Sequence, residues 1–285
     1  MKDKNNENIN ISRNYINEKN NGINNYNDNF ITSIFKINKN NLNQRIINSY
    51  ENTKNEEHHR PWKEIDPIEN EEQIKECQIY INDKKIDFCY YYNFPYEGTY
   101  IIKYKFKNIL TSTDFLFYDC KCLISLDFSN FNTSLVTSMI YMFDSCESLI
   151  CLDLSNFNTQ QVTDMRCMFR GCKSLNVVNL SNFNTEQVNN MGSMFSRCNS
   201  LISLDLSSFK TKEVNNMSFM FNDCNSLVSL NLSSFEIKNV AKKGFMFNNC
   251  NSLTLLYLSN FNTEQINNIF NDCNSLFYRF IKRVT

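Results

Sequence analysis

From about residue 108 onward, hydrophobic residues recur at a fixed period of 26 positions. One unit reads C-x-S-L-x-x-L-x-L-S-x-F-x-T-x-x-V-x-x-M-x-x-M-F. A fixed period of about 20 to 50 residues is typical of repeat proteins, in which each unit packs its hydrophobic face against its neighbours. The pattern therefore predicts about seven stacked units that share one continuous core.

Two parts of each unit have different periodicities. In the L-x-x-L-x-L part, the last two leucines (Leu204 and Leu206 in one unit) fall on the same face of a short strand. The V-x-x-M-x-x-M-F part has three- and four-residue spacing, which predicts a short α- or 3₁₀-helical segment. Between them, S-N-F-N-T turns the chain. The expected fold is therefore an α/β-type repeat solenoid with short parallel strands.

One cysteine keeps its place in every unit, and metal binding, redox chemistry or packing could explain it. Zinc sites usually combine two local pairs such as C-x2-C, but Cys120 and Cys122 form only C-x-C and no His lies nearby. A buried thiol behaves as a small apolar group. Because the position lies between inward-facing Phe and Leu, we expect a structural cysteine column and no metal or cofactor. The column is Cys120, Cys146, Cys172, Cys198, Cys224, Cys250 and Cys273.

The outward strand positions are the candidate recognition residues. They form one row of Asp, Asn and Tyr and a second row of Ser. The first row is Asp127, Asp153, Asn179, Asp205, Asn231 and Tyr257, and the second is Ser129, Ser155, Ser181, Ser207, Ser233 and Ser259. Such rows could contact a basic protein, a peptide or a glycan. The alternative is a solvated polar face with hydrogen bonds between units. The flanking position, for example Cys151 and Val177, varies more.

The region before the repeats divides into two parts. Residues 1–75 are an Asn-rich leader and charged linker, with 17 Asn in the first 50 positions, and this composition predicts disorder. Residues 76–107 contain three segments rich in Ile, Tyr and Phe (77–81, 85–92 and 98–106), separated by turn candidates. They predict a small antiparallel β cap at one end of the repeat solenoid, which covers residues 108–285.

Charge and composition limit the function classes. With 29 basic and 30 acidic residues, the chain has no overall field that would recruit nucleic acid. The two histidines, His58 and His59, lie in the linker, so a Ser or Cys nucleophile in the repeats would lack its usual base. We therefore expect no enzyme. Neither a signal-peptide core nor a membrane-spanning apolar run is present, which predicts a cytoplasmic protein with reduced thiols and without membrane insertion.

The repeated pattern C-x-S-L-x-x-L-D-L-S-x-F-x-T-x-x-V-x-x-M-x-x-M-F resembles the BspA-like leucine-rich repeat family. It is also similar to the related DUF285-type repeats of unknown function, which occur in mycoplasmas and unicellular eukaryotes. The resemblance covers residues 108–277. It implies a right-handed leucine-rich-repeat-like solenoid, a role in adhesion or partner binding, the cell surface as the alternative location, and no catalytic residues to transfer.

Together these observations predict a non-enzymatic interaction or adhesion scaffold that binds a protein or glycan along the polar strand face. The alternative is a structural or self-associating repeat protein without a dedicated ligand.

Overall fold

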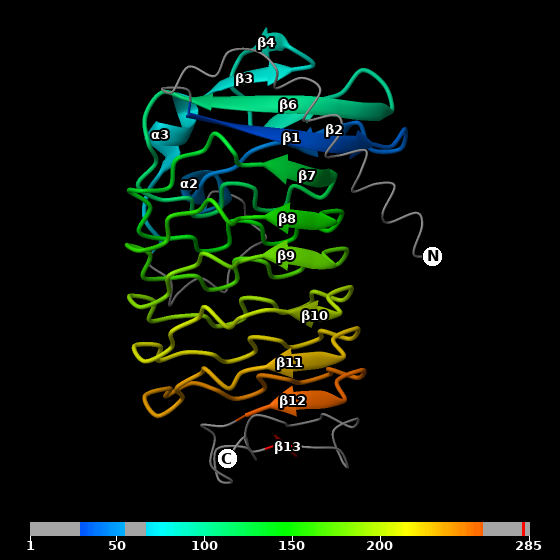
Figure 1. Ribbon diagram of the computed structural model, residues 1–285. Helices are drawn as coiled ribbons and strands as arrows, with labels where there is room; N and C mark the ends of the chain where they lie inside the picture. Colours follow the sequence, from blue (N-terminus) through cyan, green and yellow to red (C-terminus); the bar gives the residue numbers. More distant parts are fainter. Residues whose placement is uncertain (1–28, 55–66, 259–280, 283–285) are drawn as a thin grey trace.

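The N-terminal part of the chain forms a β unit at one end of the repeats (Figure 1). The computed structural model describes residues 29–54, 67–258 and 281–282. A five-stranded sheet with the order β4-β3-β6-β1-β7 joins the β unit to the first repeat. Its strands are β1 (Asn29–Ile37), β3 (Gln78–Ile81), β4 (Lys84–Ile86), β6 (Gly98–Phe106) and β7 (Leu123–Asp127).

Strand β1 connects the two parts of the molecule. It pairs antiparallel with β6 on one side and with β7, the first repeat strand, on the other. Its Ile31 and Phe35 are completely buried. The predicted disorder of residues 1–75 is therefore wrong for residues 29–54, and also for residues 67–75, which contain a helix with a completely buried Ile74. The hydrophobic residues of this Asn-rich segment are buried by strands that follow much later in the sequence.

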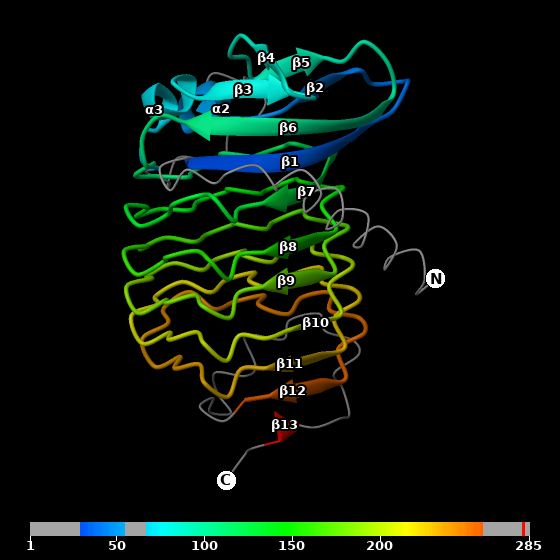
Figure 2. The same ribbon diagram turned by 45° about the horizontal axis from the view of Figure 1, so that its top comes forward.

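Smaller elements complete the β unit (Figure 2). Strands β2 (Asn43–Arg45) and β5 (Tyr91–Asn93) pair antiparallel. Among the described residues, helices α2 (Tyr50–Lys54) and α3 (Glu71–Lys75) have five residues each. The cap thus contains the antiparallel strands expected between residues 76 and 107, together with elements from residues 29–54.

The repeat units lie one below another (Figure 1). Their strands pair in parallel at a shift of 26 residues, as between Cys151 and Val177 or Ser229 and Leu255, and at a shift of 25 between Leu256 and Ile281. These strands are β8 (Cys151–Asp153), β9 (Val177–Asn179), β10 (Ser203–Leu204), β11 (Ser229–Asn231), β12 (Leu255–Tyr257) and β13 (Ile281–Lys282). A second row of single parallel bridges runs through Ser112, Ser138, Asp164, Asn190, Asn216 and Lys242.

The returning side of each unit is a series of turns. The amide of Met194 donates to the carbonyl of Met191 (3.2 Å), and that of Cys198 donates to the carbonyl of Phe195 (3.2 Å). The third residue of each turn, Ser193 or Arg197, has a positive φ. Because two left-handed residues recur four positions apart, a helix cannot span this segment. The three-residue spacing of the inward side chains reflects successive turns.

The expected fold class, an α/β leucine-rich-repeat-like right-handed solenoid, is therefore wrong. The described residues form mainly strands and turns, and their two short helices both precede the repeats. The strands belong to several small separate sheets of two to five strands.

Columns of identical side chains build the core between units. The rings of Phe169 and Phe195 stack with centroids 5.3 Å apart, and those of Phe195 and Phe221 with centroids 5.7 Å apart. A second column places Phe183 and Phe209 6.2 Å apart. Since each ring lies against its equivalent in the next unit, the sequence period becomes a continuous apolar column.

Candidate functional site

The described members of the cysteine column are completely buried. From Cys146 onward, their thiols donate hydrogen bonds to the Phe carbonyl of the preceding unit, for example from Cys172 to Phe143 (3.1 Å) and from Cys224 to Phe195 (3.1 Å). Burial raises the pKa of both thiols well above its usual range. The column therefore joins neighbouring units, and its thiols are poor nucleophiles. Cys273 lies outside the described residues.

Metal binding finds no support at these positions. The described cysteines form no disulfide, and the described residues contain no group of three or more His, Cys, Asp or Glu that could hold a metal ion. A thiol that donates to a carbonyl is protonated, whereas a metal-ligating thiol is deprotonated. The geometry thus fits packing and hydrogen bonding between units.

The predicted recognition row has a local structural role. The Oδ1 atoms of Asp153, Asp205 and Asn231 each accept a hydrogen bond from the backbone N–H two residues later, at 3.1, 2.9 and 3.0 Å. These are Asx turns, which end the strand of each unit. Hydrogen bonds from Ser207 lower the pKa of Asp205, which keeps this carboxylate charged.

The residues of the two predicted recognition rows lie along the strand side and differ in how far they are exposed. Exposed members are Asp153, Asp205, Asn231, Ser129, Ser181 and Ser207, whereas Asp127, Asn179, Tyr257, Ser155 and Ser233 are half-buried. Ser259 lies outside the described residues. Asn179 also links two units, because its Nδ2 donates to Oδ1 of Asp153 (2.9 Å).

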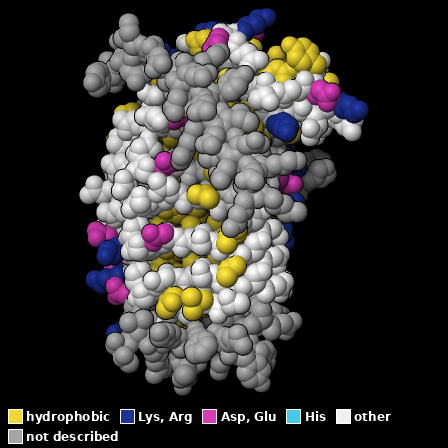
Figure 3. Space-filling view, turned by 45° about the vertical axis from the view of Figure 1, so that its right-hand side comes forward, with side chains coloured by type: hydrophobic (Ala, Val, Ile, Leu, Met, Phe, Trp, Pro, Cys, Tyr) yellow, Lys and Arg dark blue, Asp and Glu magenta, His cyan; other side chains and the backbone are white. Residues whose placement is uncertain are grey.

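An apolar row beside these residues was missed in part by the sequence prediction. Ile202 is 56% exposed and Val228 is 43% exposed, and the amide of Val228 donates to the carbonyl of Ile202 (3.0 Å). Val177 is 54% exposed and follows Asn176, the residue of its own unit that is equivalent to Ile202. Figure 3 shows hydrophobic side chains that reach the surface of the repeat stack among uncharged ones. The signal in the sequence was an apolar residue at the first x of L-x-x-L.

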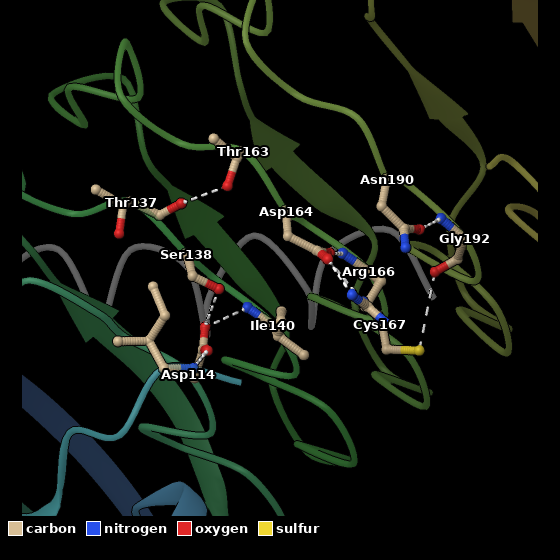
Figure 4. Close-up of polar contacts among 11 residues, drawn as sticks. Asp114, Thr137, Ser138, Ile140, Thr163, Asp164, Arg166, Cys167, Asn190 and Gly192 are labelled. Atoms are coloured by element: carbon tan, nitrogen blue, oxygen red, sulfur yellow. Dashed lines mark hydrogen bonds and ion pairs between the residues drawn. The ribbon is translucent and has the colours of Figure 1, made fainter. Parts of the chain in front are cut away.

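The side of the second bridge row carries buried polar groups (Figure 4). Asp114 is completely buried, and its Oδ1 accepts hydrogen bonds from the Ser138 hydroxyl (2.6 Å) and the Ile140 amide (2.8 Å). Its Oδ2 accepts from the amide of Ile68 (2.9 Å), which belongs to the segment before α3. Burial raises the pKa of Asp114 to about 7. This carboxyl group ties the β unit to the first two repeats.

A further polar column holds the turns together. The hydroxyl of Thr185 donates to the carbonyl of Lys210 (2.8 Å) and accepts from the amide of the same residue (2.7 Å). Thr133, Thr159 and Thr211 make the same pair of bonds to the following unit. All four are buried. Each hydroxyl thus satisfies two backbone groups that no strand pairing reaches.

No helix among the described residues is long and apolar enough to cross a membrane. A search of the curated proteins and a search of the solved structures found no match to the chain. A family model described as "Mycoplasma protein of unknown function, DUF285" matches residues 96–201 and 174–280, which together cover most of the repeats and the end of the cap. The relation to BspA-like repeats stays a prediction. On this match, the chain belongs to the DUF285 family of proteins of unknown function.

Proposed function

We propose that the protein is a non-enzymatic scaffold that binds a protein partner along the strand side of its repeats. The observation that carries the proposal is the pair of exposed apolar side chains Ile202 and Val228 at equivalent positions of adjacent units, with the exposed Val177 offset by one position in the unit before them. It lies on the same side as the predicted recognition residues. Aliphatic groups exposed next to one another gain free energy when a partner buries them, at about 25 cal/mol per Å².

The backbone beneath this surface favours binding without rearrangement. Parallel pairing fixes β11 against β12, and the stacked phenylalanines support the strands from within. The side chains on the strands are therefore held in fixed positions before a partner arrives, which lowers the entropic cost of binding. Repeat proteins commonly bind along such extended faces.

The chemistry of the repeats supports a binding role over catalysis. The column cysteines are protonated and buried. The hydroxyl groups of the threonine column are hydrogen-bonded to backbone groups, as Thr185 is to Lys210. A nucleophile needs an accessible atom and an adjacent base. An aliphatic row also fits a protein better than a glycan, whose surface consists largely of hydroxyl groups.

The proposal is tested by an Ile202→Thr/Val228→Thr double variant. Thr254 occupies the equivalent position of the next unit, so the substitution is already compatible with the fold. The matched control is Leu135→Gln, which removes an exposed leucine (46%) elsewhere on the unit and copies Gln161. Each full-length protein, tagged, is mixed with lysate of the source cells and with its untagged copy, and bound proteins are identified by mass spectrometry.

We expect wild type and Leu135→Gln to retain the same partner protein, and the double variant to lose it. Equal recovery of every protein by all three would refute the strand-side proposal. Recovery of the untagged copy by wild type alone would identify the partner as a second copy of this chain.

A further inference from the structure

We infer that copies of this chain associate head to tail, with the Tyr96 loop of one copy docked on Phe219 and Phe245 of the next. The Tyr96 loop comprises residues 94–97, which connect β5 to β6. It docks on the returning side of the repeats, so this contact is independent of the strand-side proposal. The interface joins the β unit of one copy to later repeats of another.

Phe219 and Phe245 form an exposed aromatic pair on the returning side. They are 40% and 39% exposed, and their rings stack with centroids 5.1 Å apart. The equivalent rings of the first two units, Phe115 and Tyr141, are buried, and Tyr50 of α2 lies 5.6 Å from Phe115 between ring centroids. The start of this aromatic column is thus covered by a tyrosine from the β unit of the same chain. Within the described ranges, no such ring covers Phe219 and Phe245.

The backbone makes an aromatic residue unfavourable at these two positions. Phe219 and Phe245 both have a φ of 58°, in the left-handed region that bulky side chains avoid. Ser193 has a φ of 57° at the equivalent position of the preceding unit, so the turn accepts a small polar residue. The exposed rings gain less from packing than the buried Phe115, so folding alone does not account for them. Strain that folding does not explain is typical of functional sites.

Tyr96 has the chemistry that fits this aromatic pair. It is 67% exposed, more than any other large hydrophobic side chain in the described part of the chain. Its loop is supported from beneath, because Phe94 is buried and the Tyr100 hydroxyl donates to the carbonyl of Tyr96 (2.9 Å). The connection between β5 and β6 lies at the outer edge of the β unit, where a second molecule can reach it (Figure 2). A tyrosine presented on a fixed loop loses little conformational entropy on binding.

The charges beside the two aromatic surfaces are complementary. Glu97 follows Tyr96 and is exposed. The three turns around Phe219 (190–198, 216–224 and 242–250) contain the basic residues Arg197, Lys242 and Lys243 and the acidic residue Asp223. Arg197 and Lys242 are exposed. The receiving surface thus has an excess of positive charge, which favours an aromatic side chain that carries an acidic neighbour.

The test uses the full-length protein and two variants, each of which disables one of the two surfaces. Tyr96→Ser removes the ring from the loop, and Phe219→Ser/Phe245→Ser copies Ser193 on the returning side. Leu135→Gln, which removes an exposed leucine outside both surfaces, is the control. Sedimentation velocity measures the mass at about 1 to 200 µM protein, because an interface of this small size is weak.

We expect the mass of wild type and Leu135→Gln to rise above that of the monomer with increasing concentration, and each variant alone to remain monomeric. An equimolar mixture of the two variants should form a dimer and nothing larger. Each variant supplies the surface that the other lacks, and a contact between two different surfaces is then formed once. A contact between two identical surfaces would not be restored by mixing.

Glu97→Lys provides a second loop variant that changes an exposed charge and leaves the core intact. It should also lower the mass, most clearly at about 50 mM salt, where surface charges are screened least. A monomeric wild type, a wild-type mass in Tyr96→Ser or Glu97→Lys, or a mixture of variants without the dimer would overturn the inference. The strand-side proposal is judged separately, because Ile202 and Val228 take no part in this contact.

Discussion

The thiol of Cys198 donates a hydrogen bond to the backbone carbonyl of Phe169 in the preceding unit, with Sγ and O 3.1 Å apart. The same carbonyl oxygen also accepts a hydrogen bond from the amide of Cys172 (3.1 Å), so the thiol of Cys198 binds to the second lone pair of that oxygen. The 26-residue period thus places a thiol donor beside a carbonyl that already accepts one backbone hydrogen bond. The cysteine fills space and joins two units.

Substitution of Cys198 separates these two roles. Alanine leaves a small cavity and removes the donor, whereas serine leaves a similar cavity but can still donate to Phe169. We expect both variants to lower the free energy of unfolding by about 1 to 2 kcal/mol, with serine no worse than alanine. Urea denaturation measures the difference.

Cys77 provides the control for that comparison. It is buried in the β unit, and its thiol lies 3.6 Å from the carbonyl of the adjacent Gln78, farther than the 3.1 Å between Cys198 and Phe169. There serine should be more destabilising than alanine, because the shorter C–O bond leaves the buried hydroxyl too far from this carbonyl to donate well. The same order of serine and alanine at both positions would contradict a hydrogen-bonding role for Cys198.

Burial also predicts the order in which thiols react. Burial raises the pKa of Cys198 and Cys224 well above its usual range, whereas Cys89, Cys122 and Cys151 are half-buried. Brief treatment of the native protein with iodoacetamide at about pH 8 should therefore modify Cys89, Cys122 and Cys151 before the buried cysteines of the column. Peptide mass spectrometry identifies the modified positions, and the unfolded protein serves as the control, in which all should react alike. Early modification of Cys198 would show that the units separate readily.

The threonine column gives a larger effect on stability. Thr185→Val retains the shape of the side chain, but leaves the amide and the carbonyl of Lys210 without their partner. We expect a loss of about 2 to 4 kcal/mol in the free energy of unfolding and faster hydrogen exchange at the Lys210 amide. Thr185→Ser should recover most of the loss.

Thr254→Val is the matched control for the threonine column. The hydroxyl of Thr254 donates to the carbonyl of Val228 (3.3 Å), but its side chain is exposed, so water replaces the lost bond. We expect a change of less than about 0.5 kcal/mol. A similar loss at Thr185 and Thr254 would mean that burial of the bond does not matter.

The sequence was informative at positions where the same residue type recurs in every repeat unit. Phe195 stacks on Phe169 and Phe221, its equivalents in the adjacent units, and Cys198 and Leu201 recur with the same period and are completely buried, as the pattern predicted. The predicted role of Asp205 was less complete. Periodicity placed it outward, but its bond to the amide of Ser207 depends on the local turn, which an Asp in an x position does not reveal.

Two features depended on information that a single unit does not contain. The helical prediction for residues 188–195 failed because spacing of three describes successive turns as well as a helix, and the left-handed residue Ser193 is not a glycine. Strand β1 was missed because its pairing partners, β6 and β7, lie far along the chain. Its Asn-rich neighbours concealed a short apolar strand.

The final prediction concerns the buried carboxyl group that joins the β unit to the repeats. In the folded protein, burial raises the pKa of Asp114 to about 7, and the charge of Asp164 acts in the same direction. In the unfolded chain, the pKa of an aspartate is about 3.9. Between these values the folded state binds more protons than the unfolded state, so the free energy of unfolding falls as the pH rises from about 4 to about 7.

Asp114→Asn removes this titration. We expect the wild type to lose on the order of 1 to 3 kcal/mol between pH 5 and pH 7.5, and the variant to lose less, because its amide has the same charge at both values. Urea denaturation at the two pH values measures the slope. Asp205→Asn is the control, since hydrogen bonds lower the pKa of Asp205 and place its titration below this window. An equal slope in wild type and Asp114→Asn would show that Asp114 is already ionised at pH 5, and that its three hydrogen bonds from Ser138, Ile140 and Ile68 outweigh the cost of burying the charge.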